Sequence, residues 1–308
     1  MFNQSVGEIN ESLIRLGTRQ SVVYLAKGDP DMLIGGGGQW VIPTLEQQIR
    51  KFHIDMDRVR YLLIGHSHYD HCGAVPYLQK RYPHLEVLAS RGAAKLFAME
   101  KAVKNMRKFS RRAMEEMGAP MQFNGMSLEF DGIQVAKSLQ EGDRVDLGKK
   151  LIFEVYETPG HSRCSIMMYV PEKKWLFCSD SIPLPADNGK RLMCTASESY
   201  ITFLASLRKM EPLPIRLCAW EHFGYMTGKE AQGIIPKAIN STLEYKRLLR
   251  ERVAQSQDIE MTAQWAVGEW IATTGFKFLP SDVMMHIQRT MVENAVEERV
   301  EEDEATRS

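Results

Sequence analysis

Residues 60–72 read RYLLIGHSHYDHC, an apolar run that passes directly into a cluster of histidines. The run over 60–64 is short and apolar, which is typical of a buried strand. The histidine cluster therefore begins where that strand is expected to end, and a helix is expected to follow over 72–81. Loops at strand ends are where such proteins carry binding and catalytic side chains. The segment thus predicts a functional loop at the edge of a sheet.

Five of the eight histidines, together with two aspartates, form a candidate metal site. The seven residues are His66, His68, Asp70 and His71 in HSHYDH, His161 in TPGHS, Asp180 in FCSDS, and His222 in WEHFG. Each of the last three follows an expected strand, over 151–157, 175–178 and 215–219 respectively. Seven imidazole and carboxylate donors are enough to hold two divalent ions. Two such ions bring the pKa of a bound water from 15.7 toward ~7, so metal-bound hydroxide is available without a side-chain base.

Short apolar runs alternate with helical patterns, which favours a layered α/β architecture. Further strands are expected over 21–26, 31–34, 85–89, 133–136, 144–146 and 165–170, and helices after Pro43 and over 198–210. A basic helical segment over about 93–117 has the look of an insertion. From Lys229 onward only helices are expected, over 229–254, 259–273 and 281–300. We therefore predict a catalytic domain over 1–228 with a helical insertion at about 92–120, and a C-terminal helical region over 229–308 that caps the active site.

The seven residues and their order resemble the signature of the metallo-β-lactamase superfamily. That resemblance implies a four-layer αββα sandwich with a dinuclear site at one edge of its two sheets. It also implies one ion held by His66, His68 and His161, a second held by Asp70, His71 and His222, and Asp180 as the bridge.

Within the superfamily, the likeness is greatest to thioesterases of a quinolone-signal pathway. It is carried by LLIGHSHYDHCGAVPYLQKRYPHLEVLAS, EGDRVDLG, GHS, LFCSD and FLPSDVMMHIQRTM. The last ligand lies in WEHFG rather than the more usual PGH context, which leaves ligation intact. The segment over 181–194 diverges, which leaves the substrate open.

Charge and composition exclude several classes of protein. Lys+Arg and Asp+Glu both number 39, so no basic footprint for a nucleic acid exists. No apolar run approaches the ~18 residues of a membrane span, and the first residues lack the apolar stretch of a signal peptide. The five cysteines are scattered and never in CxxC spacing, as expected of reduced thiols. We expect a cytoplasmic protein with no membrane or nucleic-acid partner.

An acyl thioester, such as an acyl-coenzyme A, is the least demanding substrate for such a site. A thiol has a pKa of roughly 8.5 and leaves with little protonation, whereas an alkoxide or amide leaving group requires a general acid. Asp70 is the one candidate for a catalytic acid. Two alternatives stay open: a lactonase acting on a signalling lactone, and a regulatory effector with a vestigial site, as a homodimer or bound to a regulatory protein. The metals can be iron, zinc or manganese, because imidazole and carboxylate ligands accept all three.

Three other groups of residues have two interpretations each. Lys104, Lys108, Arg111 and Arg112 either meet phosphates of a coenzyme A substrate or form a solvated face. Trp265, Trp270, Phe276, Phe278, Met284 and Met285 either line an acyl pocket or pack the helical region onto the sandwich. His53, His84 and His286 are expected to be structural or exposed.

Overall fold

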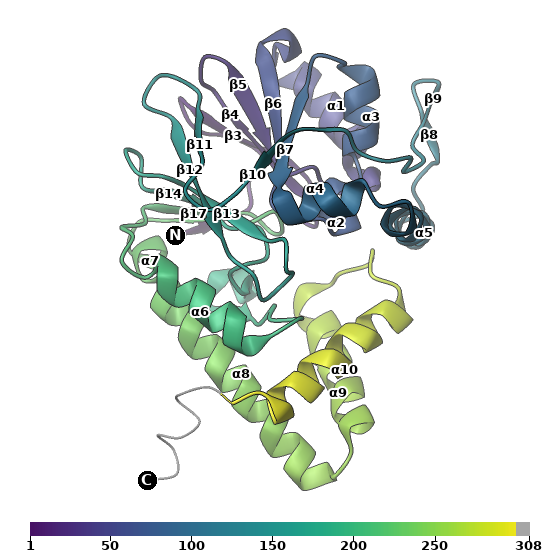
Figure 1. Ribbon diagram of the computed structural model, residues 1–308, viewed down its shortest axis with the longest axis vertical. Helices are drawn as coiled ribbons and strands as arrows, with labels where there is room; N and C mark the ends of the chain where they lie inside the picture. Colours follow the sequence, from purple (N-terminus) through teal and green to yellow (C-terminus); the bar gives the residue numbers. More distant parts are fainter. Residues whose placement is uncertain (300–308) are drawn as a thin grey trace.

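Two seven-stranded sheets face each other in the upper part of the molecule, as a computed structural model describes it over residues 1–299 (Figure 1). The first sheet has the order β10 (Val135–Leu139), β7 (Glu86–Ser90), β6 (Val59–Ile64), β5 (Asp31–Ile34), β4 (Val22–Ala26), β3 (Leu13–Gly17) and β2 (Gly7–Asn10). The second has the order β1 (Phe2–Asn3), β18 (Tyr225–Thr227), β17 (Leu217–Ala219), β14 (Trp175–Phe177), β13 (Ile166–Val170), β12 (Ile152–Glu157) and β11 (Arg144–Asp146). Two small hairpins accompany them, β8 (Gln122–Phe123) with β9 (Met126–Ser127) and β15 (Leu184–Ala186) with β16 (Arg191–Met193).

The helices form the outer layers and a separate C-terminal group. They are α1 (Ile42–Lys51), α2 (Tyr69–Cys72), α3 (Val75–Arg81), α4 (Arg91–Phe97), α5 (Glu100–Glu116), α6 (Tyr200–Met210), α7 (Lys229–Gln232), α8 (Ile234–Ser256), α9 (Ile259–Thr274) and α10 (Ser281–Glu297). Helices α8, α9 and α10 pack against one another below the sandwich, and α6 links them to it (Figure 1). The predicted four-layer αββα sandwich with C-terminal helices is confirmed.

Side chains alternate between two cores along each strand, because successive residues of a strand point to opposite faces. In β4, Val22, Tyr24 and Ala26 belong to the core between the sheets, whereas Val23 and Leu25 belong to the core under the helices. All five are buried. This double burial explains why the strands read as continuous apolar runs rather than as alternating ones.

Strand direction brings the candidate loops to one edge of the sandwich. Strands β5, β6, β7 and β10 are parallel neighbours, and β14 is parallel to β17. Strand β12 runs antiparallel to β13, which runs antiparallel to β14, so β12 ends at the same edge as β14. The loops after β6, β12, β14 and β17 therefore meet, as the placement of the histidines and aspartates after these strands requires.

The basic segment over 93–117 is two helices rather than one. Helix α4 begins at a cap in which the Ser90 hydroxyl accepts a hydrogen bond from the Ala93 amide, and it packs on β7 and β10. Met99 is extended, which ends the first helix and lets α5 turn away to pack against α2. The helix that packs on the sheet is therefore distinct from the one that projects from it.

The described C-terminal region is helical as expected, but the helix expected over 229–254 is divided at Gly233 into α7 and α8, so four helices replace the three expected. The last of them, expected over 281–300, ends at Glu297, and residues 300–308 of the expected region lie outside the described part of the chain. No helix within residues 1–299 is both long and apolar enough to cross a membrane.

Two neighbours on β12 test the assignment of the inter-sheet core. Phe153 is fully buried between the sheets, whereas the preceding Ile152 is 37% exposed. Phe153→Ala is expected to lower the free energy of unfolding by about 3–5 kcal/mol, because it leaves a cavity among close-packed side chains. Ile152→Ala, the matched control, is expected to cost well under half as much in urea unfolding. Equal costs would contradict this description of the core.

Candidate metal centre

The first four candidate ligands lie on the loop that leaves β6. His68 has extended backbone and precedes the single turn α2, which carries Asp70 and His71. The glycine run over 35–38 packs against this loop: the Gly36 amide donates to the His71 carbonyl oxygen at 2.9 Å. A Cβ on Gly36 would lie 2.7 Å from that oxygen, so a side chain there is excluded. These glycines thus form a surface against which the ligand loop packs.

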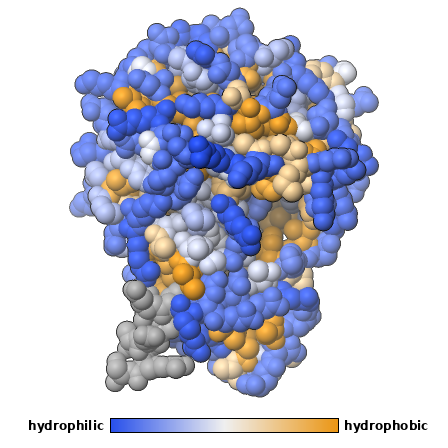
Figure 2. Space-filling model, viewed as in Figure 1, coloured by the Kyte–Doolittle hydropathy of each residue, from blue (hydrophilic) through white to orange (hydrophobic). Residues whose placement is uncertain are grey.

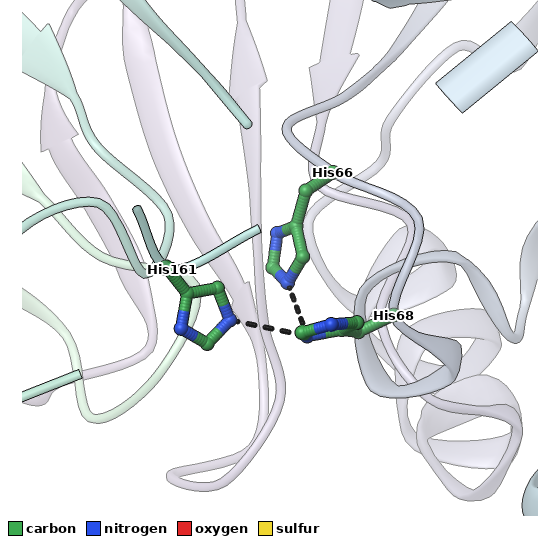
Figure 3. A group of neighbouring side chains, drawn as sticks. All are labelled: His66, His68 and His161. Carbon is green, nitrogen blue, oxygen red and sulfur yellow. Dashed lines mark hydrogen bonds between the residues drawn. The ribbon is translucent and has the colours of Figure 1, made fainter. Parts of the chain in front are cut away.

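Three histidine rings converge in the first part of the site (Figure 3). The Nδ1 atom of His68 lies 3.0 Å from Nε2 of His66 and 3.1 Å from Nε2 of His161. His66 and His161 are buried, whereas His68 is exposed. Three ring nitrogens that converge in this way form a donor set suited to binding a metal cation.

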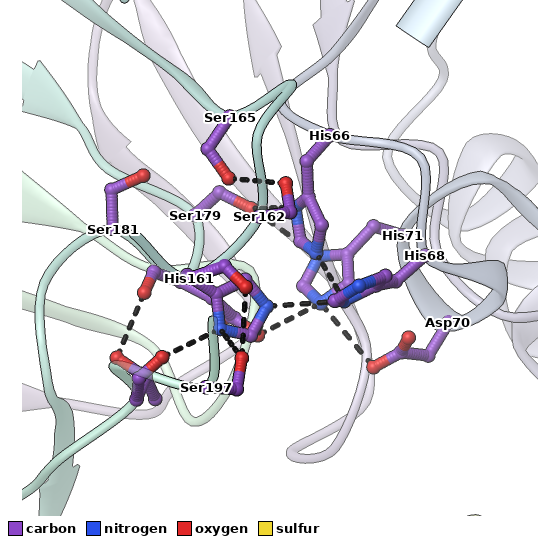
Figure 4. Close-up of polar contacts among 12 residues, drawn as sticks. His66, His68, Asp70, His71, His161, Ser162, Ser165, Ser179, Ser181 and Ser197 are labelled. Atoms are coloured by element: carbon purple, nitrogen blue, oxygen red, sulfur yellow. Dashed lines mark hydrogen bonds and ion pairs between the residues drawn. The ribbon is translucent and has the colours of Figure 1, made fainter. Parts of the chain in front are cut away.

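A second group lies directly beside the first. The Nε2 atoms of His71 and His222 are 3.0 Å apart, and each lies 3.3 Å from Oδ2 of Asp70. The carboxylate of Asp180 lies between the groups: its Oδ2 is 3.2 Å from Nε2 of His71 and 3.5 Å from Nε2 of His161. The structure therefore brings all seven predicted residues together, with Asp180 in the position expected of a bridge. Figure 4 shows five of them, His66, His68, Asp70, His71 and His161.

The outward-facing nitrogens of the rings have their own partners. Nδ1 of His161 donates to the Thr195 carbonyl oxygen at 2.8 Å, and Nδ1 of His222 donates to the Gln20 carbonyl oxygen at 2.7 Å. A carbonyl oxygen can only accept, so in both rings Nδ1 carries a proton and Nε2 is the nitrogen that faces the centre. This is the orientation that neighbours impose on metal-binding histidines.

The charges of the site also fit divalent metal. Burial lowers the pKa of the His66 and His161 imidazoles, which keeps them neutral. Burial alone would raise the pKa of the Asp180 carboxyl, but His71 and His222 hold it below its ordinary value. Neutral imidazoles and ionised carboxylates are the forms that bind metal.

Two further observations test the fit of a cation at this site. Oδ1 of Asp180 is buried and, among the described residues, has no hydrogen-bond partner. The pKa of His71 is raised against the effect of burial by Asp180 and Asp70, so a proton there supplies the positive charge that these carboxylates need. A bound cation would interact with the unpartnered carboxylate oxygen and would supply the positive charge that the carboxylates need.

Glu221 and Ser179 were missed by sequence reasoning. The buried Glu221 carboxylate accepts a hydrogen bond from Nδ1 of His71 at 2.9 Å, and the Ser179 hydroxyl lies 3.2 Å from Nδ1 of His66. Both residues directly precede a candidate ligand in the sequence. Gly65 makes room for them, because a Cβ there would lie 2.9 Å from both side chains. No spacing rule identifies such residues, although a carboxylate next to a metal-binding histidine is a usable signal.

Three of the four basic side chains singled out on α5 form ion pairs with acidic ones. Lys104 pairs with Glu100, and Arg111 with Glu129, at 2.7 and 2.8 Å. Arg112 forms a two-pronged ion pair with Asp282 at the start of α10. The last of these pairs ties the projecting helix to the C-terminal region, beside the site.

The chain belongs to the metallo-β-lactamase superfamily, whose sequence pattern matches residues 16–222. The matched span begins in β3 and ends on His222, so it contains all seven residues of the site. The superfamily consists of metal-dependent hydrolases, and the chain is one of its members by sequence, fold and site.

Several known proteins are similar to parts of the chain. A hydroxyacylglutathione hydrolase of Stenotrophomonas maltophilia is 30% identical over 169 residues, which are 54% of this chain and 48% of that protein. One from Legionella pneumophila is 26% identical over 124 residues, 40% of this chain and only 34% of its own length. Among solved structures, a metallo-β-lactamase family protein from Thermus thermophilus has a TM-score of 0.64 at 17% identity, covering 94% of this chain and 93% of that one. That likeness is one of fold.

Replacing Glu221 tests whether it supports the metal centre. Glu221→Gln keeps the size of the side chain but removes the charge that faces His71, and metal affinity is expected to fall about 10–100-fold. Competition with a chromophoric chelator measures this affinity. Glu86→Gln is the matched control, because Glu86 pairs with Arg60 on the surface. Unchanged affinity in Glu221→Gln would show that the carboxylate does not support the ligands.

Proposed function

We propose that the protein hydrolyses an acyl thioester with two divalent metal ions. His66, His68 and His161 would hold one ion, Asp70, His71 and His222 the other, and Asp180 both. When bound, such ions supply an activated water and polarise the carbonyl group of the substrate. The observation that carries the proposal is the position of these ligands, which form one wall of a largely apolar cavity.

The cavity has a volume of about 380 Å³ and joins the ligands to the C-terminal helices. His68, Asp180 and His222 lie on one side, and Trp270, Phe276, Phe278 and Met284 lie on the other. Figure 2 shows apolar surface where the sandwich meets these helices. Cavities of this size and character bind small organic ligands. An acyl chain placed here would bring its carbonyl group to the ligands.

The residues singled out for an acyl pocket divide into two groups. Trp270, Phe276, Phe278 and Met284 line the cavity. The Arg252 guanidinium instead lies over the Trp265 ring, with its Cζ atom 3.6 Å from the ring centre. Met285 packs against the main core. His286, expected to be structural or exposed, is exposed and also lines the cavity.

The leaving group favours a thioester over an ester or a lactone. A thiolate departs with little protonation, whereas an alkoxide requires a proton donor. Asp70 was the candidate donor, but His71 and His222 hold the pKa of its carboxyl well below the ordinary value against the effect of burial. Asp70 is therefore a carboxylate, the form that binds metal, and it has no proton to donate to a leaving group.

Similarity to named proteins supports the same substrate class. The relatives named hydroxyacylglutathione hydrolases act on a thioester, although the matches span about a third to two thirds of their length. The resemblance of several segments, including FLPSDVMMHIQRTM in the C-terminal region, to the quinolone-signal thioesterase PqsE also favours a thioester substrate. We also propose the domain division near residue 228, with the region over 229–308 as the part that shapes the acyl cavity.

Hydrolysis by variants tests the proposal. Asp70→Ala removes a ligand of the proposed second ion and is expected to lower kcat/KM for acyl-coenzyme A thioesters at least about 100-fold. Asp57→Ala, an exposed carboxylate remote from the site, is expected to leave it unchanged. A panel of acyl thioesters and homoserine lactones gives the measurement. Faster turnover of lactones, or full activity of Asp70→Ala, would contradict the proposed reaction.

A further inference from the structure

The apolar cavity contains a glutamine that neither the metal centre nor the proposed reaction uses. Gln288 lies on α10, lines the cavity and is fully buried. Its neighbours one turn away on the helix, Met284 and Met291, are buried and apolar. A polar side chain in such surroundings is costly unless its hydrogen bonds are satisfied.

The amide of Gln288 has an N–H donor without a strong acceptor. A glutamine amide has one carbonyl oxygen and two N–H donors. The Tyr245 hydroxyl donates to Oε1 at 3.1 Å. Burial raises the pKa of the Tyr245 phenol, so this hydroxyl keeps its proton. On the other side, the hydrogen-bond partner of Nε2 among the described residues is the Met284 sulfur at 3.9 Å, and a thioether is a weak acceptor.

A second donor in the same cavity wall is also unsatisfied. The indole N–H of Trp270, on α9, is buried and has no acceptor within residues 1–299. Trp270 and Gln288 both line the cavity, from helices that pack against each other. Two N–H donors without strong acceptors in one apolar wall indicate that an acceptor arrives with a ligand.

We propose that this wall binds a neutral oxygen on the acyl group of the substrate, at a position removed from the thioester carbonyl. The inference rests on the proposed thioesterase function and names the substrate class: acyl chains that carry an internal keto or hydroxyl oxygen. A neutral acceptor fits because the surroundings of Gln288 are thioethers and rings. Gln288 and Trp270 lie outside the span over 16–222 that matches the superfamily, so membership of the superfamily does not assign this subsite.

Sites built to hydrogen-bond a substrate group discriminate strongly against analogues that lack it. The measurement is kcat/KM of the metal-loaded protein for octanoyl-coenzyme A and for its 5-oxo and 7-oxo forms. The wild-type protein is expected to favour one oxo form over octanoyl at least about tenfold. Gln288→Leu, which removes the donors at similar size, is expected to reduce this preference to about twofold or less. A ratio of two substrates does not depend on the fraction of folded protein.

A control variant and a second measurement keep the outcomes distinct. Gln264→Leu, at an exposed glutamine on α9, is expected to retain the preference. Calorimetry with octanoic acid and its oxo forms gives affinity without turnover. Equal turnover and equal binding of all chains, or a preference that survives Gln288→Leu, would overturn the subsite. Tighter binding of an oxo acid without any thioester hydrolysis would support the subsite and contradict the proposed reaction.

Discussion

The arrangement of ring nitrogens at the edge of the two sheets is the constraint on which the rest of the structure depends. Nε2 of His161 and of His222 must face the centre, because their Nδ1 protons are held by backbone carbonyl oxygens of Thr195 and Gln20. These carbonyl groups come from loops of both sheets. The ligands therefore meet only when the two sheets are packed together, so metal binding depends on the folding of the whole sandwich.

The C-terminal region takes part in this arrangement as well as forming the far wall of the cavity. Phe278 stacks on the His222 ring, with centres 5.7 Å apart, and its carbonyl oxygen accepts a hydrogen bond from Tyr69. Arg19 lies over the Phe223 ring and donates to the Thr274 carbonyl oxygen. The segment that lines the far side of the apolar cavity thus also contacts His222, a proposed metal ligand.

The sequence predicted local features well where a single segment carries the information. The strand over 60–64 and the ligand loop after it follow from an apolar run and a dense motif, and β5 and β11 have the expected bounds. The later ligands were found because each follows a strand. The strands β1, β2, β3 and β18 were missed, because runs of two to five residues, interrupted by charged side chains in β2 and β3, show too little pattern.

Features that depend on tertiary contacts could not be predicted from the sequence. Glu221 acquires its role only because the loop after β17 folds against His71, and the run over 35–38 only because it lies under the ligand loop. Gln288 reads as an ordinary helical polar residue until the packing of α10 against α8 and α9 buries it. The division of the segment over 93–117 into two helices follows from where α4 meets the sheet, which no local propensity encodes.

The number and position of bound ions test the central claim most directly. Anomalous diffraction from crystals of protein purified without chelator, with elemental analysis of the same sample, identifies and locates each metal. The account predicts two ions per chain, one among His66, His68 and His161, the other among Asp70, His71 and His222, with Asp180 in contact with both. A chain that binds no metal under these conditions, or binds it away from these residues, would contradict the account.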